Sequence, residues 1–422
     1  MRTRELRDPV TITFDGDAIP AERGEPVAAA LLASGKLVLA RSSKFHRPRG
    51  PACFRGACDG CLARVNEQPN VMTCLVPAEN GIVVASQNAL GSREVDLLRV
   101  TDWFFPEGMN HHELFAGVPG VQRVMQVFAR RVAGLGRLPK VATKPRTARR
   151  READVVVVGA GPAGMAAATA LAGRGRAVEV IDDALEGGGG ARALLGEDAH
   201  AWTAIADAFA KSGASLRSAT VAAGFYGDDL LVAGPGEEGA EIVTARAFVL
   251  APGAHDGVLA FEGNDLPGVM SARAAGWLLA RGVLVGKRVV VVVAEGGGPF
   301  GDAYARGVAK AGAPCEVTVL RGTPTGAHSG SRSARVKEAT IDIDGKAVTR
   351  SCDALLVDAP RAPAYEVCAQ AGAELAHEAR GFVVRTKSGK IRDAIWALGE
   401  VTGTPLEPSR ILEEALALAS RI

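Results

Sequence analysis

Four of the seven cysteines lie in one stretch, CFRGACDGCLARVNEQPNVMTC, at residues 53–74. Their spacing, C-x4-C-x2-C-x12-C, begins like the plant-type pattern that holds a 2Fe-2S cluster, in which each iron needs two protein sulfurs besides the bridging sulfides. Gly56 and Gly60 let the backbone wrap an anionic cluster with its N–H groups turned inward. The sequence therefore predicts a 2Fe-2S cluster held by Cys53, Cys58, Cys61 and Cys74.

A zinc ion is the structural alternative for four cysteines. Zinc motifs usually pair two short C-x2-C hooks, and only Cys58 and Cys61 form one in this stretch. The spacing therefore favours the cluster. Arg55 adds a positive charge within the loop, which stabilises the reduced and more negative form of a cluster. The remaining three cysteines are scattered, so the sequence indicates a reducing compartment and no disulfide framework.

The residues on both sides of the cysteine stretch predict a small sheet with one helix. Residues 10–14 and 18–22 are strand-like and are joined by the turn Asp15-Gly16-Asp17. Residues 27–33 form a short apolar helix between Pro26 and Gly35. Residues 62–65 and 82–85 supply further strands. This order predicts an N-terminal α+β domain with the ferredoxin-like β-grasp fold at residues 1–95.

A glycine motif follows farther along the chain. Residues 155–158 form a buried type of strand that leads into the fingerprint G-x-G-x-x-G ahead of an Ala-rich helix. The first glycine permits a tight turn, the second lets a pyrophosphate approach the backbone, and the third lets helix and strand pack closely. The helix N-terminus attracts the phosphates. The motif predicts a dinucleotide site at Gly159, Gly161, Pro162, Ala163 and Gly164.

Three later features bear on the identity of the dinucleotide. Asp182 follows the next strand, where a ribose-binding carboxylate is expected, although alone it reads as a strand-end turn residue. Residues 187–190 and 397–403 resemble segments of glutathione-reductase-type flavoproteins, in which a carboxylate at the position of Glu400, after Gly399, approaches the flavin ribityl and phosphate region. Gly253 is the last residue of a third such segment, Ala251-Pro252-Gly253. These features favour FAD, with Glu400 and Pro252 departing from the usual Asp and Thr.

A second nucleotide-type fold begins with a strand at residues 287–293. Gly296, Gly298 and Gly301 precede a helix that continues through Lys310, and the paired strand ends in Arg321 in place of an acid. Arg321 suits the 2'-phosphate of NADP. The alternative interpretation is that Arg321 is a solvated strand-end residue of a fold that binds no cofactor. The sequence leaves NAD(P) binding open for this second fold.

These motifs predict an α/β chain with two Rossmann-like folds of the glutathione-reductase type after the β-grasp domain. The first would comprise residues 153–286 plus 380–422, with the second inserted at 287–379. Residues 96–152 would connect them to the first domain. Within that connection, residues 139–152 are basic and contain two prolines, which predicts a solvated linker.

Composition narrows the classes of function. Hydrophobic residues make up 47% and charged residues 23% of the 422, which is an ordinary globular balance. A net charge of +2 and an aromatic content of 5% argue against nucleic acid as the partner. The N-terminal residues lack the apolar core of a secretory signal, and the apolar run 155–173 contains a glycine motif. The sequence thus predicts a cytoplasmic chain without a transmembrane segment.

Several stretches together resemble the alpha-type subunits of multimeric sarcosine oxidase and the related proline, opine and cyanide-producing amino-acid dehydrogenases. They are residues 41–50 (RSSKFHRPRG), 86–88 (SQN), 131–136 (RVAGLG) and 263–270 (GNDLPGVM). The resemblance covers nearly the whole chain. Some members of this family have the four cluster cysteines and others lack them.

The resemblance implies a partner, an amino-acid-oxidase-like flavoprotein subunit that removes hydride from the amine carbon. It also implies an FMN between the subunits and, at the first glycine motif, FAD, NAD or another adenine nucleotide. The basic residues Lys44, His46, Arg47 and Arg49 would line such an FMN, or else form a basic loop beside the cluster domain. The terminal electron acceptor is not implied.

The chain shows no convincing acid/base or nucleophile constellation. His111 and His112 lack accompanying carboxylates or cysteines and are read as ordinary polar residues. We therefore expect an electron-transfer subunit of a flavin-dependent amine or amino-acid dehydrogenase or oxidase, of the sarcosine, proline, opine or glycine type. The alternatives are a stand-alone NAD(P)H-dependent FAD/2Fe-2S reductase and a scaffold in which only the cluster is active.

Overall fold

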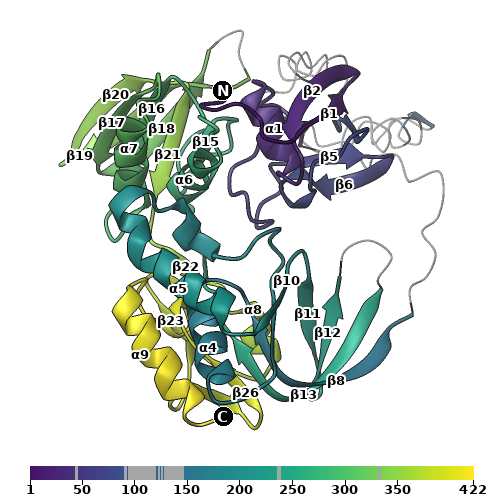
Figure 1. Ribbon diagram of the computed structural model, residues 1–422. Coiled ribbons are helices and arrows are strands. Elements are labelled where there is room, and N and C mark those ends of the chain that lie inside the picture. The colour runs from purple at the N-terminus through teal and green to yellow at the C-terminus, as the bar shows by residue number, and fades with distance from the viewer. Residues whose placement is uncertain are drawn as a thin grey trace.

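The computed structural model describes residues 1–42, 46–89, 147–234, 239–330 and 334–422, together with positions 93, 120, 121, 124 and 127. Figure 1 shows three units: the purple N-terminal unit and the green middle unit lie at the top, and the teal and yellow unit lies below both. Buried residues of all three belong to one continuous hydrophobic core. The units are therefore joined by packing as well as by the chain.

The N-terminal unit is a five-stranded sheet in the order β2-β1-β7-β5-β6. Asp15 and Gly16, between β1 and β2, have φ angles of 49° and 91°, as a two-residue hairpin turn requires. The helix α1 buries Val27 through Leu32 in the core. The predicted β-grasp fold is confirmed. The elements are β1 (Pro9–Phe14), β2 (Asp17–Glu22), α1 (Val27–Ala33), β3 (Ala40–Arg41), β4 (Pro48–Arg49), β5 (Leu62–Val65), β6 (Gln68–Met72), η1 (Thr73–Leu75) and β7 (Val83–Ala85).

The lower unit contains the first glycine motif. Its sheet runs β10-β9-β8-β13-β12-β11, and β26 pairs with β13 in parallel. Helix α4 packs against both α5 and α9. The elements are β8 (Arg149–Val158), α4 (Pro162–Ala172), β9 (Val178–Ile181), η3 (Gly189–Ala193), η4 (Gly196–Ala199), α5 (His200–Lys211), β10 (Ser215–Arg217), β11 (Val221–Tyr226), β12 (Asp229–Ala233), β13 (Ala240–Leu250), β25 (Lys390–Arg392), β26 (Ile395–Ala397), η5 (Glu400–Thr402) and α9 (Pro408–Ala419).

The middle unit combines a parallel sheet, in the order β15-β21-β16-β17, with an antiparallel sheet, in the order β18-β19-β20. Its elements are β15 (Val269–Ser271), α6 (Ala272–Ala280), β16 (Arg288–Val293), α7 (Phe300–Lys310), β17 (Glu316–Arg321), β18 (Thr323–Ser329), β19 (Val336–Ile343), β20 (Lys346–Ser351) and β21 (Ala354–Asp358). The chain passes between the two nucleotide-type units at β14 (Ala254–His255) and β22 (Ala362–Pro363), and continues to α8 (Glu366–Gln370), β23 (Glu374–Glu378) and β24 (Gly381–Arg385).

The structure differs from the expected domain organisation at three boundaries. Strand β8 begins at Arg149, so the end of the expected linker at 139–152 is wrong. Arg149 and Arg151 pair with Glu241 on the neighbouring strand β13, at 2.7 and 2.8 Å, so their charges are compatible with a strand. The second fold starts before residue 287, because β15 pairs in parallel with β21. The chain also returns to the first fold before residue 380, since Cys368 packs in that fold's core.

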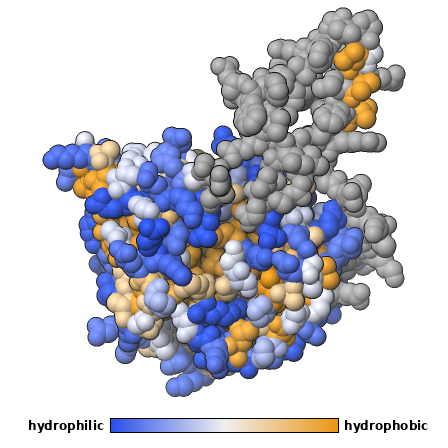
Figure 2. Space-filling view, turned by 90° about the horizontal axis from the view of Figure 1, so that it is seen from above, coloured by the Kyte–Doolittle hydropathy of each residue, from blue (hydrophilic) through white to orange (hydrophobic). Residues whose placement is uncertain are grey.

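The predicted strand-turn-helix at residues 155–173 is confirmed by β8 and α4. Among the described residues, no helix is both long enough and apolar enough to cross a membrane. Polar residues cover much of the face seen in Figure 2, with apolar residues in smaller groups between them.

Candidate functional site

The four cysteines of the first stretch lie together as two pairs. Cys53 contacts Cys58, and Cys61 contacts Cys74. The hydrogen bond from Cys58 lowers the pKa of Cys53, and the one from Cys74 lowers the pKa of Cys61. One thiol of each pair is thereby stabilised as the thiolate, the form that binds metal.

The arrangement of the four thiols in two pairs distinguishes between zinc and a 2Fe-2S cluster. A tetrahedral zinc ion needs four ligands around one point. A 2Fe-2S cluster needs two ligands at each of two irons, which is what two pairs of thiols supply. The donors therefore fit a 2Fe-2S cluster.

Close backbone contacts hold the loop that carries these thiols. A Cβ atom at Gly60 would lie 2.2 Å from the carbonyl oxygen of Gly50, so only glycine fits there. Gly56 has a φ of 70°, in the region that favours glycine. The buried Thr73 hydroxyl donates to the carbonyl oxygen of Cys61 at 2.7 Å and so joins the last two cysteine positions. These contacts hold together the segments that carry the thiols.

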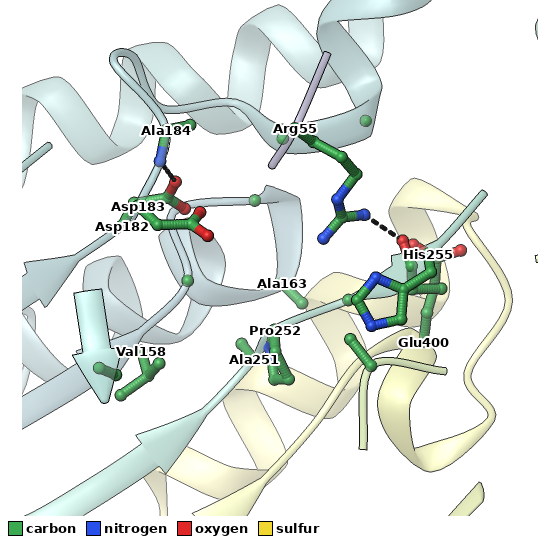
Figure 3. Close-up of a pocket in the computed structure, with 18 of the residues that line it drawn as sticks. Arg55, Val158, Ala163, Asp182, Asp183, Ala184, Ala251, Pro252, His255 and Glu400 are labelled. Atoms are coloured by element: carbon green, nitrogen blue, oxygen red, sulfur yellow. Dashed lines mark hydrogen bonds between the residues drawn. The ribbon is translucent and has the colours of Figure 1, made fainter. Parts of the chain in front are cut away.

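A cavity of about 380 Å³ lies between the cysteine loop and the first glycine motif. Phe54, Arg55 and Cys74 line it from the N-terminal unit. Residues of the predicted nucleotide site line the opposite side: Gly159, Gly161, Pro162, Ala163, Asp182, Gly253 and Glu400. Figure 3 shows Arg55 pointing between Asp182 and Asp183 on one side and His255 and Glu400 on the other. The structure thus brings most of the predicted nucleotide residues together with one predicted cluster ligand.

The glycine motif has the geometry that a pyrophosphate needs. Gly159 has a φ of 102°, and a Cβ there would lie 2.3 Å from the carbonyl oxygen of Ala251. A Cβ at Gly164 would lie 1.9 Å from the carbonyl oxygen of Gly159, so only glycine allows α4 to lie this close to the turn after β8. Gly161 has open space where a Cβ would be. The motif is therefore tight at its two ends and open in its middle, so the cavity fits the pyrophosphate of a dinucleotide.

Asp182 lies at the end of β9 as predicted. Its carboxylate accepts the N–H groups of Ala160, at 2.5 Å, and of Ala184, at 2.8 Å. Burial raises the pKa of Asp182 to about 6, in spite of these two donors. The carboxylate fixes the turn of the glycine motif and still lines the cavity, where a ribose hydroxyl can donate to it.

Sequence reasoning missed Arg361, the partner of Glu400. Its guanidinium donates to both Glu400 oxygens, at 2.6 and 2.7 Å, and to the carbonyl oxygen of Ala254 at 2.8 Å. A Cβ at Gly253 would lie 3.8 Å from the Glu400 carboxylate, and one at Gly399 would lie 2.7 Å from Ala163. The C-terminal motif therefore closes the cavity beside the start of α4. No signal in the sequence marks Arg361, because it is 39 residues from Glu400.

A second buried ion pair links the cysteine loop to the nucleotide-type units. Arg273 donates to Asp256 at 2.7 Å and also to the carbonyl oxygen of Cys53. Burial opposes ionisation of Asp256, yet Arg273 lowers its pKa to about 2. Ser271 donates to the same carboxylate at 2.9 Å. Sequence reasoning did not identify this group, which holds the cluster loop against the cavity.

The second glycine motif is filled by a side chain of its own fold. The Asp358 carboxylate accepts the N–H of Gly298 at 3.1 Å and the N–H of Gly301 at 2.7 Å. Burial raises the pKa of Asp358 to about 6. Arg321 pairs with Asp302 at 2.9 Å and faces a hollow that Glu295, Asp342 and Asp344 also line. The N–H groups that would bind a pyrophosphate thus already have an anionic partner.

The stretches that carry the family resemblance also meet in space. Arg47 and Arg49 both face Asp265, at 3.7 and 2.8 Å. The amide of Asn88 donates to the carbonyl oxygen of Arg41 at 3.1 Å. Lys44, His111, His112 and residues 131–136 lie outside the described residues, so the predictions made for them stay predictions.

Comparison with known proteins agrees with this geometry. Residues 7–89 match the family described as 2Fe-2S iron-sulfur cluster binding domain, and residues 153–339 match the family described as pyridine nucleotide-disulphide oxidoreductase. The crystal structure of L-proline dehydrogenase from P. horikoshii has a TM-score of 0.73 at 20% identity, over 99% of this chain and 74% of that one. That likeness shows the fold, in which a ferredoxin-type domain precedes two Rossmann-like folds.

Proteins related in sequence identify the family more narrowly than the likeness in fold does. The chain is 30% identical over 297 residues to the alpha subunit of sarcosine oxidase from Rhizobium meliloti (strain 1021), covering 63% of this chain and 30% of the relative. It is 34% identical over 188 residues to one of the subunits of opine oxidase from Agrobacterium tumefaciens (strain Ach5), covering 40% and 36%. The chain thus spans about a third of the length of these relatives. It belongs to the oxidoreductase family that contains the alpha subunits of sarcosine oxidase and this opine oxidase component.

Proposed function

We propose that this chain is the electron-transfer subunit of a multi-subunit, flavin-dependent amine or amino-acid dehydrogenase or oxidase. It binds FAD at the first glycine motif and a 2Fe-2S cluster at Cys53, Cys58, Cys61 and Cys74. Electrons pass from a partner flavin through these two groups to an acceptor. The substrate is a secondary amine or amino acid of the sarcosine, proline, opine or glycine type.

One observation carries this proposal: the cavity beside the glycine motif is lined by Cys74 and by Phe54 and Arg55 of the cysteine loop. A dinucleotide in that cavity therefore lies against the loop that holds the cluster. A flavin supplies the conversion of a two-electron delivery into the single electrons that a cluster accepts. The chain's own residues bind and orient: Asp182 faces the ribose, the start of α4 faces the phosphates, and the Arg361–Glu400 pair closes the far end.

The partner that we propose is an amino-acid-oxidase-like flavoprotein subunit, with an FMN at the interface beside Lys44, His46, Arg47 and Arg49. Arg47 is 64% exposed and shares Asp265 with Arg49, so it can turn toward a phosphate of FMN. All seven cysteines are free thiols, which suits a reducing compartment such as the cytoplasm.

The stand-alone NAD(P)H reductase has less support. A second dinucleotide would need the N–H groups of the Gly296–Gly301 motif, which Asp358 occupies. A 2'-phosphate would need Arg321, which pairs with Asp302 beside three further carboxylates. We therefore propose that the second fold binds no cofactor and positions Arg361 and α6 at the first site.

The test uses the full chain, purified without air, alone and with the candidate partner subunit. We expect about two irons and two sulfides per chain, FAD on mass spectrometry after denaturation, and amine oxidation only in the complex. In the complex, Cys61→Ser should leave reduction of the partner's flavin by substrate intact and slow electron delivery past the cluster in stopped-flow absorbance. Amine turnover by the isolated chain, or loss of flavin reduction in an assembled Cys61→Ser complex, would contradict the relay.

A further inference from the structure

Arg55 belongs to the cysteine loop but its side chain lies in the nucleotide cavity. It stands between Cys53 and Cys58 in the sequence, and its guanidinium donates to the carbonyl oxygen of Ala254 on β14. Ala254 also accepts from Arg361, so one carbonyl joins the cluster loop to the far end of the cavity. Figure 3 shows Arg55 above Ala163, at the start of α4. The side chain thus faces the helix terminus where phosphates bind.

The charges around Arg55 are unbalanced. Arg273 is neutralised by Asp256, and Arg361 is neutralised by Glu400. Arg55 forms no ion pair with any of the described residues. Arg55 is partly buried, lines the cavity and has no direct ion pair within this part of the chain, so its guanidinium is available to an anionic ligand.

The glycine motif needs such a cation. Asp182 and Asp183 line the same cavity and repel a pyrophosphate. The N-terminus of α4 offers only partial positive charge, and Ala160 already donates its N–H to Asp182. A guanidinium opposite the helix start offsets the two carboxylates and donates charge-assisted hydrogen bonds to phosphate oxygens.

We propose that Arg55 binds the phosphates of the nucleotide in this cavity and thereby couples nucleotide binding to reduction of the cluster. The inference rests on the proposed function, since it requires both groups. Phosphate neutralises a positive charge that the cysteine loop itself carries. Nucleotide binding therefore disfavours the reduced, more negative cluster, and reduction weakens nucleotide binding by the same factor.

The experiment uses the full chain with its cluster intact, dialysed to remove nucleotide, and ADP as the probe because FAD and NAD share that moiety. Titration calorimetry should show Arg55→Gln weakening ADP binding at least tenfold. Arg55→Lys should restore part of the affinity. Arg23→Gln is the matched control in the same unit, because Arg23 is 54% exposed and pairs with the exposed Asp8.

Redox titration followed by the electron paramagnetic resonance signal of the reduced cluster supplies the second readout. ADP should lower the midpoint potential of the wild-type chain, by about 59 mV if it binds the oxidised form tenfold more tightly. Without ADP, Arg55→Gln should have a lower potential than wild type, and the ADP concentration that saturates wild type should shift its potential less. The visible spectrum of the cluster checks that each variant is folded.

The outcomes separate the two proposals. If wild type binds neither ADP nor FAD, the proposed nucleotide site is wrong and the coupling fails with it. If wild type binds ADP and Arg55→Gln binds it equally well, or if the same ADP concentration shifts the potential of Arg55→Gln as far as that of wild type, the role of Arg55 alone is wrong.

Discussion

The chain contains two G-x-G-x-x-G loops that look alike in sequence and differ in what fills them. At Gly159–Gly164, the middle glycine faces a cavity and the nearby Asp182 accepts only the N–H of Ala160 from the loop. At Gly296–Gly301, Asp358 accepts the N–H groups of Gly298 and Gly301. In the first loop the acid comes from the strand beside the loop and supports its turn. In the second it comes from β21 and caps α7, so the same motif serves as an internal helix cap.

The largest effect should follow from closing the first loop at its tightest point. In Gly164→Ala the new Cβ would lie 1.9 Å from the carbonyl oxygen of Gly159, so α4 must move away from β8. We expect a loss of about 3 kcal/mol in the free energy of unfolding and a weakening of ADP binding by roughly a hundredfold. Denaturant unfolding and calorimetry measure the two.

The control for that change is Gly173→Ala at the other end of α4, where a Cβ would lie 3.4 Å from the nearest atom. It should leave ADP binding unchanged. Equal effects of the two substitutions would show that the loss comes from the helix in general and not from the loop.

We expect Asp358, which fills the second loop, to make the free energy of unfolding depend on pH. Asp358 is 3% exposed and its pKa is raised to about 6, so the folded chain holds this proton more tightly than the unfolded chain. Its contribution to stability is full below about pH 4 and is lost as the pH rises through 6, by up to about 3 kcal/mol. Asparagine cannot titrate, so the free energy of unfolding of Asp358→Asn should rise by that amount relative to wild type between pH 4 and 7.

Denaturant unfolding of both proteins across this pH range gives the difference, in which other titrating groups cancel. A constant difference between wild type and Asp358→Asn would mean that Asp358 is not the buried cap of α7.

A smaller effect should follow from filling the middle of the first loop. Gly161→Ala places a Cβ in open space, so the free energy of unfolding should change by less than about 0.5 kcal/mol. The same Cβ stands where a pyrophosphate approaches, so ADP binding should weaken roughly tenfold, about 1.4 kcal/mol. Unchanged affinity would place the phosphates elsewhere in the cavity.

The smallest effect should follow from Arg321→Gln. Arg321 is 67% exposed and pairs with the partly exposed Asp302, so removing it should change the stability by less than about 0.5 kcal/mol. NADPH should bind neither protein, as measured by calorimetry. NADPH binding that Arg321→Gln abolishes would reopen the reductase alternative.

Elements with local signals could be predicted from the amino-acid sequence. The turn at Asp15-Gly16, the helix Val27–Ala33 and the strand Leu62–Val65 depend on residues a few positions apart, and the structure has them where they were expected. The same holds for the first glycine motif, because a strand, a tight turn and a helix N-terminus occupy one short segment. The four cysteines stood out for the same reason, since their spacing within 22 consecutive residues carries the signal.

Contacts between charged or polar groups far apart in the chain could be found only in the folded structure. Arg361 and Glu400 are 39 residues apart, Gly301 and Asp358 are 57 apart, and Arg55 and Ala254 are 199 apart. Nothing in the local sequence distinguishes Asp358 from Asp182, or Arg55 from a solvated arginine. A carboxylate or guanidinium acquires its role from the group that lies opposite it after folding. Only the packing of β21 against β16 could show that one glycine loop is filled, while the other remains open beside the cysteines.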